Sequence, residues 1–118
     1  MPTPSWHPER LAARLPFLRR RAALTATVRA FLSARGYQEV ETPCLVPAPG
    51  MEVHLRAFRT RYRPHLGAGR EAVLWLRTSP ELALKRLLVA GAGPVFELAR
   101  VWRNVESGPR HAPEFTML

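Results

Sequence analysis

Two apolar stretches near the C-terminus, separated by a polar loop, constrain the fold of this chain most strongly. Residues 94–103 and 114–118 are each predicted to form a strand, and the loop between them holds Gly, Ser and two Pro residues, which are typical of turns. The apolar side chains of both stretches predict that this hairpin packs on a core. Its charged and aromatic residues would then gather at the mouth of the hairpin.

Four side chains at this mouth suit a nucleotide, namely Arg103, Arg110, His111 and Phe115. A guanidinium group can bind two phosphate oxygens at once, and a phenyl ring offers a stacking face for adenine. The spacing alone, however, favours a solvated charge at Arg103 and an ordinary core position for Phe115.

The hairpin resembles motif 2 of the class II aminoacyl-tRNA synthetases in its lysyl form. The match runs from Arg103-Asn104 through His111 to Pro113-Glu114-Phe115-Thr116-Met117. The resemblance implies that Arg103 binds the α-phosphate of ATP and that Phe115 stacks on the adenine. It also implies ATP contacts from the loop, at Asn104, Val105, His111 and Ala112, with His111 near the outer phosphates.

Two loop residues depart from the pattern of this family. Val105 stands where the family has an acidic residue, and Ala112 stands where it has Asn. Backbone groups at these positions could keep part of the ATP contact, whereas a need for side-chain oxygens would weaken nucleotide binding. Whether Glu106, one position along, replaces the missing acid is left open by the sequence.

A helix followed by a short strand is predicted before this hairpin. Residues 17–35 carry Leu24, Val28, Phe31 and Leu32 at the spacing of an apolar stripe, and Gly36 provides a stop. Residues 37–43 alternate as a strand up to Pro43, which either simply ends the strand or belongs to a resemblance to motif 1 of the same family. Motif 1 implies a homodimer interface that includes Pro43. Residues 1–16, rich in Pro, are expected to form an extended arm.

Strands are also predicted over residues 53–62 and 72–76, with a loop over 64–69 and a helix that begins near Pro80. Thr78 and Glu81 have the spacing of a capping box, and Glu81 with Lys85 forms an i, i+4 pair. Leu84, Leu87 and Leu88 are expected to face the core. Capping alone would explain Glu81.

Ser79-Pro80-Glu81 also resembles the segment in which lysyl enzymes hold their amino acid. That resemblance implies a substrate pocket lined by Ser79, Pro80 and Glu81, with Glu81 binding the ammonium group.

These elements predict an α+β fold, an antiparallel sheet flanked by helices, as part of a class II synthetase catalytic domain. We expect residues 1–16 to form the arm and residues 17–118 to form the N-terminal part of that domain, with motifs 1 and 2. Motif 3 is not found, so we expect the 118 residues by themselves to lack adenylation activity.

Motif 1 begins within about twenty residues of Met1, too few for an anticodon-binding OB-fold. The run Val40-Glu41-Thr42-Pro43-Cys44 and the segment around Ser79 resemble the short lysyl-tRNA synthetase paralogues that attach (R)-β-lysine, or lysine, to a lysine of elongation factor P. This resemblance implies ATP and Mg²⁺ as cofactors, elongation factor P as the protein partner, and no tRNA. It gives no metal ligand within this segment. Arg103 and Mg²⁺ would stabilise the charge that builds up on the α-phosphate.

Composition adds weaker constraints. The net charge of +9 makes an acidic partner plausible, although it could equally reflect a general bias towards arginine, since Lys85 is the only lysine. A lone cysteine, Cys44, and the lack of a signal peptide or membrane-spanning segment predict a cytoplasmic protein. Two alternatives stay open, namely a segment of a lysyl-tRNA synthetase and a non-catalytic basic module that binds nucleic acid.

Overall fold

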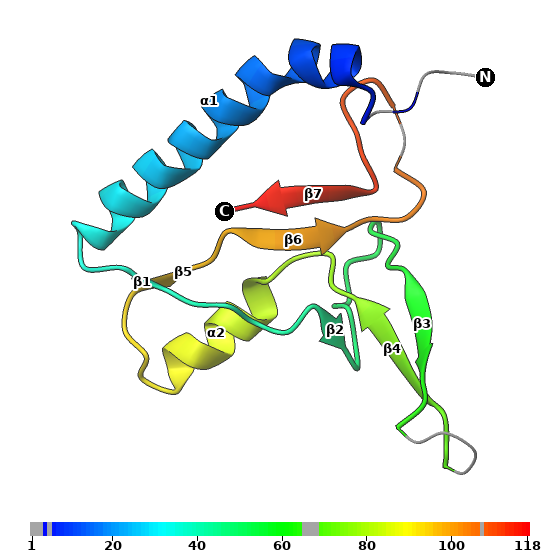
Figure 1. Cartoon of the computed structure of the whole chain (residues 1–118). Helices are drawn as coiled ribbons and strands as arrows, with labels where there is room; N and C mark the ends of the chain where they lie inside the picture. The colour runs from blue at the N-terminus through cyan, green and yellow to red at the C-terminus, as the bar shows by residue number, and fades with distance from the viewer. Residues whose placement is uncertain (1–3, 5, 65–68, 107) are drawn as a thin grey trace. The chain divides into compact units, whose positions relative to one another are not determined.

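The computed structural model describes residues 4, 6–64, 69–106 and 108–118. The chain divides into two compact units, Met1–Tyr37 and Gln38–Leu118, which are described separately. The first unit contains one long helix, α1, and the second contains the strands β1 to β7 and the helix α2 (Figure 1).

Helix α1 spans Pro8–Ser33, so it begins nine residues earlier than predicted. The expected extended arm is therefore wrong from Pro8 onward, while residues 1–3 and 5 of that arm lie outside the described residues. Pro8 suits the first helical position, and Pro16 lies inside the helix. Pro16 does not end the helix, because the Ala, Leu and Arg residues around it are strong helix formers that offset one missing hydrogen bond.

The end of α1 follows the prediction more closely. Gly36 has a φ of +81°, and its N–H donates to the carbonyl oxygen of Ser33 at 3.0 Å. The N–H of Tyr37 donates to the carbonyl oxygen of Leu32 at 3.1 Å. This arrangement satisfies the last carbonyl groups of the helix and needs a residue that adopts a left-handed conformation without strain.

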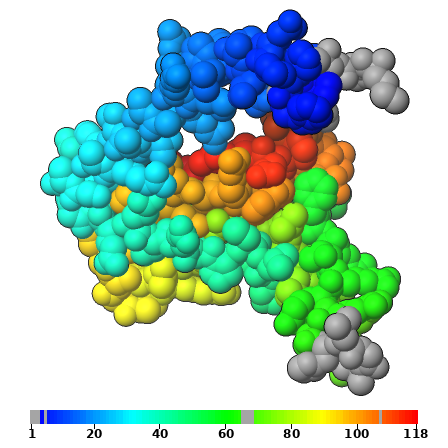
Figure 2. All heavy atoms as spheres, viewed as in Figure 1, coloured from blue at the N-terminus to red at the C-terminus, as the bar shows by residue number. Residues whose placement is uncertain are grey.

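The apolar stripe predicted on α1 is not covered within the described residues. No residue of the helix is buried, and Leu24 and Phe31 are 65% and 52% exposed. The side chains of α1 are drawn in blue to cyan in Figure 2. The hydrophobic pattern therefore identified a helix correctly, but not a buried one.

Among its described residues, the second unit contains three small sheets rather than one. Strands β2 (Leu45–Val46), β4 (Ala72–Leu76) and β3 (Arg59–Tyr62) form an antiparallel sheet in that order. Strands β6 (Ala99–Trp102) and β7 (Glu114–Met117) form the predicted antiparallel hairpin. Strand β1 (Gln38–Glu39) pairs with β5 (Val95–Phe96) in parallel, which the prediction of an antiparallel sheet did not anticipate. The α+β class is confirmed.

Several strands are shorter than the sequence pattern suggested. The predicted strands over 37–43 and 53–62 shrink to β1 and β3, and β2 was not predicted at all. The strand expected over 94–103 is split into β5 and β6, because the first piece pairs with β1 and the second with β7. Most of the loop predicted over 64–69 lies outside the described residues.

Helix α2 spans Glu81–Val89, with Pro80 as its N-cap. The predicted capping box is wrong, because the Thr78 hydroxyl donates instead to the carbonyl oxygen of Pro49 at 3.3 Å. The Glu81 N–H donates to Ser79 Oγ at 3.1 Å, so Ser79 satisfies part of the helix start. Leu88, predicted to face the core, is 58% exposed.

The buried apolar residues gather next to the hairpin. Phe96, Ala99 and Val101 are 6%, 1% and 0% exposed. Ala99 and Val101 alternate with the exposed Arg100 along β6, as expected for a strand with one face on a core. Within the described part of the chain, no helix is long and apolar enough to cross a membrane.

Candidate active site

The β6–β7 hairpin brings Arg103 and Phe115 together. In its register Val101 lies opposite Phe115 and Trp102 opposite Glu114. Arg103 follows directly, and its N–H donates to the carbonyl oxygen of Pro113 at 2.9 Å. The Arg103 guanidinium carbon lies 5.2 Å from the centre of the Phe115 ring, within the range of a cation–π contact. A positive group and an aromatic face are therefore presented side by side.

One nitrogen of Arg103 is a hydrogen-bond donor without an acceptor among the described residues. Arg103 Nε is buried and has no hydrogen-bond partner among the described residues. Leaving a buried donor unpaired is costly, and native structures rarely do so without a ligand, ion or water nearby. An oxygen of a bound phosphate would satisfy this donor, which is the chemistry that the hairpin resemblance implies for ATP.

The loop after Arg103 is tied down at its first residue. The Asn104 N–H donates to the carbonyl oxygen of Arg56 at 2.6 Å, and Asn104 Oδ1 accepts a hydrogen bond from the Val105 N–H at 2.9 Å. Val105 has a φ of +66°, which is an unfavourable conformation for a β-branched residue, and it is 83% exposed. Strained residues of this kind concentrate at ligand sites.

The other predicted loop residues are more open. His111 and Ala112 are both exposed, and the His111 N–H donates to the carbonyl oxygen of Gly108 at 3.1 Å. This bond closes the turn that leads into β7. Ser107, within the same loop, lies outside the described residues.

Two of the three residues predicted to bind the amino acid, Ser79 and Glu81, line a small pocket of about 120 Å³. Ser79 and Glu81 contribute from the start of α2, and Gly50, Met51 and Glu52 contribute from the segment between β2 and β3. Pro80 is buried and does not line this pocket. No sequence pattern selects residues 50–52, because only the tertiary structure brings them beside Ser79.

Glu81 is held by the residue one turn along α2. Lys85 Nζ lies 2.6 Å from Glu81 Oε1. The hydrogen bond from Lys85 and its charge lower the pKa of Glu81 from its ordinary value, and the same contacts raise the pKa of Lys85. Glu81 is therefore ionised at neutral pH, as an ammonium-binding carboxylate must be.

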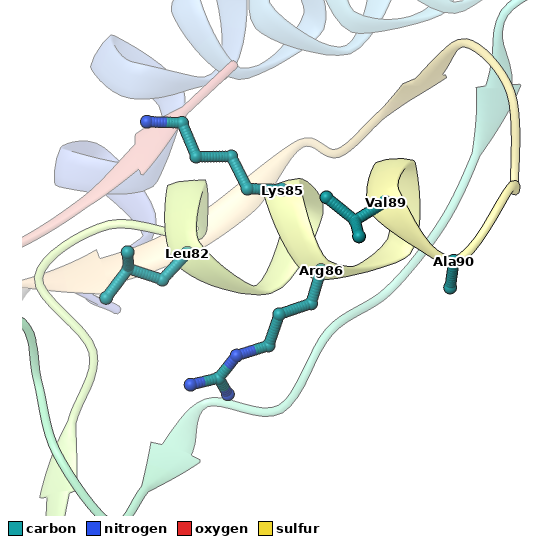
Figure 3. A pocket seen from close by; sticks show the side chains of 5 residues that line it. All are labelled: Leu82, Lys85, Arg86, Val89 and Ala90. Atoms are coloured by element: carbon teal, nitrogen blue, oxygen red, sulfur yellow. The ribbon is translucent and has the colours of Figure 1, made fainter.

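Two further hollows lie near α2. Pro43 lines one of about 80 Å³ together with Arg77, Ser79 and Arg86. A shallow depression of about 390 Å³ lies along α2, lined by Leu82, Lys85, Arg86, Val89 and Ala90 (Figure 3). The larger depression contains none of the residues predicted for the active site.

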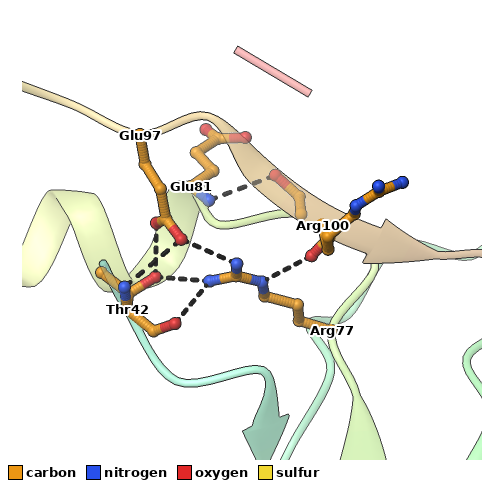
Figure 4. Close-up of polar contacts among 6 residues, drawn as sticks. Thr42, Arg77, Glu81, Glu97 and Arg100 are labelled. Carbon is orange, nitrogen blue, oxygen red and sulfur yellow. Dashed lines mark hydrogen bonds and ion pairs between the residues drawn. The ribbon is translucent and has the colours of Figure 1, made fainter. Parts of the chain in front are cut away.

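A buried polar network, missed in the sequence, joins the end of β4 to the segment after β1 and to strand β6 (Figure 4). Arg77 and Glu97 are each 4% exposed, and Arg77 Nη2 lies 2.7 Å from Glu97 Oε1. Thr42 is 8% exposed and contacts both side chains. A signal was present, because Arg77 follows the apolar strand β4 and Glu97 interrupts an apolar run. A charged residue in such a position needs a buried partner.

Direct binding of a metal ion by side chains of the described residues would need a cluster of ligands. Among the described residues, no group of three or more His, Cys, Asp or Glu side chains is placed to hold a metal ion. Mg²⁺ is commonly bound through one or two carboxylates and the phosphates of its nucleotide. In this segment Arg103, rather than a carboxylate cluster, is the group suited to the phosphates.

The chain matches a known protein family. The family described as tRNA synthetases class II (D, K and N) matches residues 10–118. The chain belongs to this family. Class II synthetases join an amino acid to an acceptor at the expense of ATP, generally with Mg²⁺, so an amino-acid ligase activity is indicated for this member. The match also accounts for the α+β fold as part of a class II synthetase domain.

Proposed function

We propose that this class II synthetase domain belongs to a ligase that activates lysine or (R)-β-lysine as an adenylate and transfers it to a lysine of elongation factor P. The observation that carries the proposal is the pairing of Arg103 with Phe115 at 5.2 Å, with Arg103 Nε buried and unpaired among the described residues. The motif resemblance supports lysine, and the resemblance of Val40–Cys44 and of the segment around Ser79 to the short paralogues supports a protein acceptor rather than tRNA.

The chemistry needs a carboxylate of the amino acid brought in line with the α-phosphate of ATP. Phe115 stacks on the adenine, and Arg103 binds the α-phosphate where negative charge develops. Asn104, Val105, His111 and Ala112 form the loop over the nucleotide. Mg²⁺ bound with ATP would supply further neutralisation of the phosphate charge, next to that from Arg103.

The amino acid occupies the pocket at the start of α2. Glu81 binds an ammonium group of the substrate, and Ser79 lines the same pocket and accepts a hydrogen bond from the Glu81 N–H. Pro80, as the N-cap of α2, sets the position of Glu81 at the start of the helix. The carboxylate displaces pyrophosphate from ATP to give a mixed anhydride, and the acceptor amine then displaces AMP from that anhydride, so no covalent enzyme intermediate is required. Pro43 belongs to the motif 1 segment that follows β1, and through this segment the protein forms a homodimer in the cytoplasm.

The test is amino-acid-dependent exchange of pyrophosphate into ATP by the full gene product, with lysine and (R)-β-lysine compared. Replacing Arg103 with Gln should lower the exchange rate about 100-fold or more, as expected for loss of a group that stabilises developing charge. Phe115→Leu should weaken ATP binding by about 10-fold, through loss of base stacking. Arg59→Gln, on the exposed strand β3, is the matched control and should change neither.

The acceptor is tested separately, by offering labelled amino acid with elongation factor P or with tRNA. Transfer to tRNA alone would assign the protein to the lysyl-tRNA synthetases instead. Absence of exchange, together with salt-sensitive nucleic-acid binding that Arg103→Gln leaves unchanged, would favour a non-catalytic basic module, which the net charge of +9 makes reasonable.

A further inference from the structure

The buried network around Arg77 connects segments that are far apart in the sequence. Arg77 Nε donates to the carbonyl oxygen of Arg100 at 3.0 Å, and Arg77 Nη1 donates to the carbonyl oxygen of Thr42 at 2.8 Å and to its Oγ1 at 2.6 Å. Arg77 Nη2 donates to Glu97 Oε1 at 2.7 Å. One guanidinium group therefore holds the segment after β1, the link between β5 and β6, and strand β6 itself (Figure 4).

Thr42 completes the network on its other side. Its hydroxyl donates to Glu97 Oε2 at 2.6 Å, and its N–H donates to Glu97 Oε1 at 3.3 Å. The Thr42 hydroxyl thus accepts from Arg77 while it donates to Glu97, so both of its hydrogen-bonding roles are used. The Arg77 guanidinium and the Glu97 carboxylate are therefore surrounded by hydrogen-bond partners that fix their orientation.

The main chain of Arg77 is fixed as well. Its N–H donates to the carbonyl oxygen of Cys44 at 3.0 Å, and its carbonyl oxygen accepts from the Trp102 N–H at 3.0 Å. Arg77 directly precedes Thr78-Ser79-Pro80-Glu81, and Trp102 directly precedes Arg103. Arg77 is therefore joined by a peptide bond to the segment that lines the amino-acid pocket. It is joined by hydrogen bonds to β6, the strand that leads into Arg103.

Ionic contacts in this position are not needed for a stable fold. A buried ion pair gains little over well-packed apolar residues of similar size, because two charges must be removed from water. What the ion pair supplies is direction, since a planar guanidinium fixes the angle and separation of each partner that it binds. A buried Arg77–Glu97 pair is therefore best explained by a function that needs the segments bound to Arg77 at a fixed separation.

We propose that Arg77, with Glu97 and Thr42, is a positioning group that sets the distance between the amino-acid pocket and the Arg103–Phe115 hairpin. This inference rests on the proposed function, because it assumes that the two half-sites bind an amino acid and ATP. Each half-site can bind its own ligand without a fixed separation. A molecule that spans both sites cannot.

The test uses a ligand of that kind, the sulfamoyl analogue of lysyl-adenylate, in which lysine is joined to adenosine through a non-hydrolysable linker. Its affinity for the purified protein is compared with the separate affinities for ATP and lysine by titration calorimetry. In the double variant Arg77→Met/Glu97→Leu, the analogue should bind about 30- to 100-fold more weakly, as expected for a displacement of about 1 Å between the two sites. ATP and lysine should each bind within about threefold of their wild-type affinities.

Two controls separate positioning from general loss of structure. Arg63→Met/Glu71→Gln removes an exposed ion pair of the β3–β4 hairpin and should leave all three affinities unchanged. Thr42→Val removes the shared hydroxyl while both charges remain, and it should weaken the analogue by about 5-fold, since it loosens the network without breaking it. Thr42→Val serves as the test if the double variant does not fold.

The outcomes are distinct. If the folded double variant, or Thr42→Val in its place, binds the analogue within threefold of wild type, the positioning role is wrong. If ATP and lysine weaken as much as the analogue does, the network only supports the fold and the proposal is again wrong. If the wild-type protein binds neither ATP nor lysine, the proposed function itself fails.

Discussion

The single substitution Arg77→Met gives the sharpest test of how this fold is held together. Methionine keeps an apolar stem of similar length but removes the guanidinium and its four hydrogen bonds. The Glu97 carboxylate then remains 4% exposed, with Thr42 as its hydrogen-bond partner but no opposite charge. Breaking a buried pair in this way costs about 3–5 kcal/mol.

That cost is a large part of the free energy of unfolding of a domain, which is about 5–15 kcal/mol in total. At about 4 °C per kcal/mol for a chain of this size, Arg77→Met should lower the melting temperature by about 12–20 °C. The double variant Arg77→Met/Glu97→Leu should recover most of this loss, because no charge is then left buried alone. The difference between single and double variants is the signature of the pair.

The measurement is urea and thermal unfolding followed by circular dichroism at neutral pH, for both single variants and the double variant. Arg63→Met is the matched control, because Arg63 pairs with Glu71 while 72% of its side chain is exposed. It should cost less than about 1 kcal/mol. A loss below about 1 kcal/mol for Arg77→Met, or a double variant no more stable than either single one, would refute this account of the buried pair.

Two further predictions concern local groups. Because Lys85 lowers the pKa of Glu81, the stability that this pair adds is present above the ordinary Glu81 pKa of 4.5 and is lost as the pH falls through the lowered value. Lys85→Gln should therefore raise the Glu81 pKa in an NMR titration, and an unchanged pKa would contradict the contact. Val105→Asn should raise the free energy of unfolding by about 1 kcal/mol, because Asn tolerates the positive φ that strains Val. An unchanged or lower denaturation midpoint would show that Val105 carries no strain.

Much of the candidate site follows from local sequence. Alternating apolar residues and a Pro- and Gly-containing loop predicted the β6–β7 hairpin. Its antiparallel register, with Val101 opposite Phe115, brings Arg103 close to Phe115. The Glu81–Lys85 pair also follows from sequence, because residues four apart on a helix are neighbours.

Contacts over longer separations could not be predicted in the same way. Thr42 and Glu97 are 55 residues apart, and the loop residues Gly50 and Glu52 meet Ser79 only because the chain folds back. The predicted capping box is wrong because the Thr78 hydroxyl donates a hydrogen bond to the carbonyl oxygen of Pro49, 29 residues away in the sequence, rather than capping the start of α2. The long strands also failed, since pairing partners rather than propensity decide where a strand ends.

The sequence by itself determined the local contacts of the hairpin and of α2, because strand alternation and i, i+4 spacing fix which neighbours can touch. The tertiary structure alone decided that Arg77 and Glu97 are buried as a pair that joins the segment before Ser79 to strand β6. The physical reason is that an arginine and a glutamate can leave water together only when distant segments deliver their hydrogen-bond partners to one place.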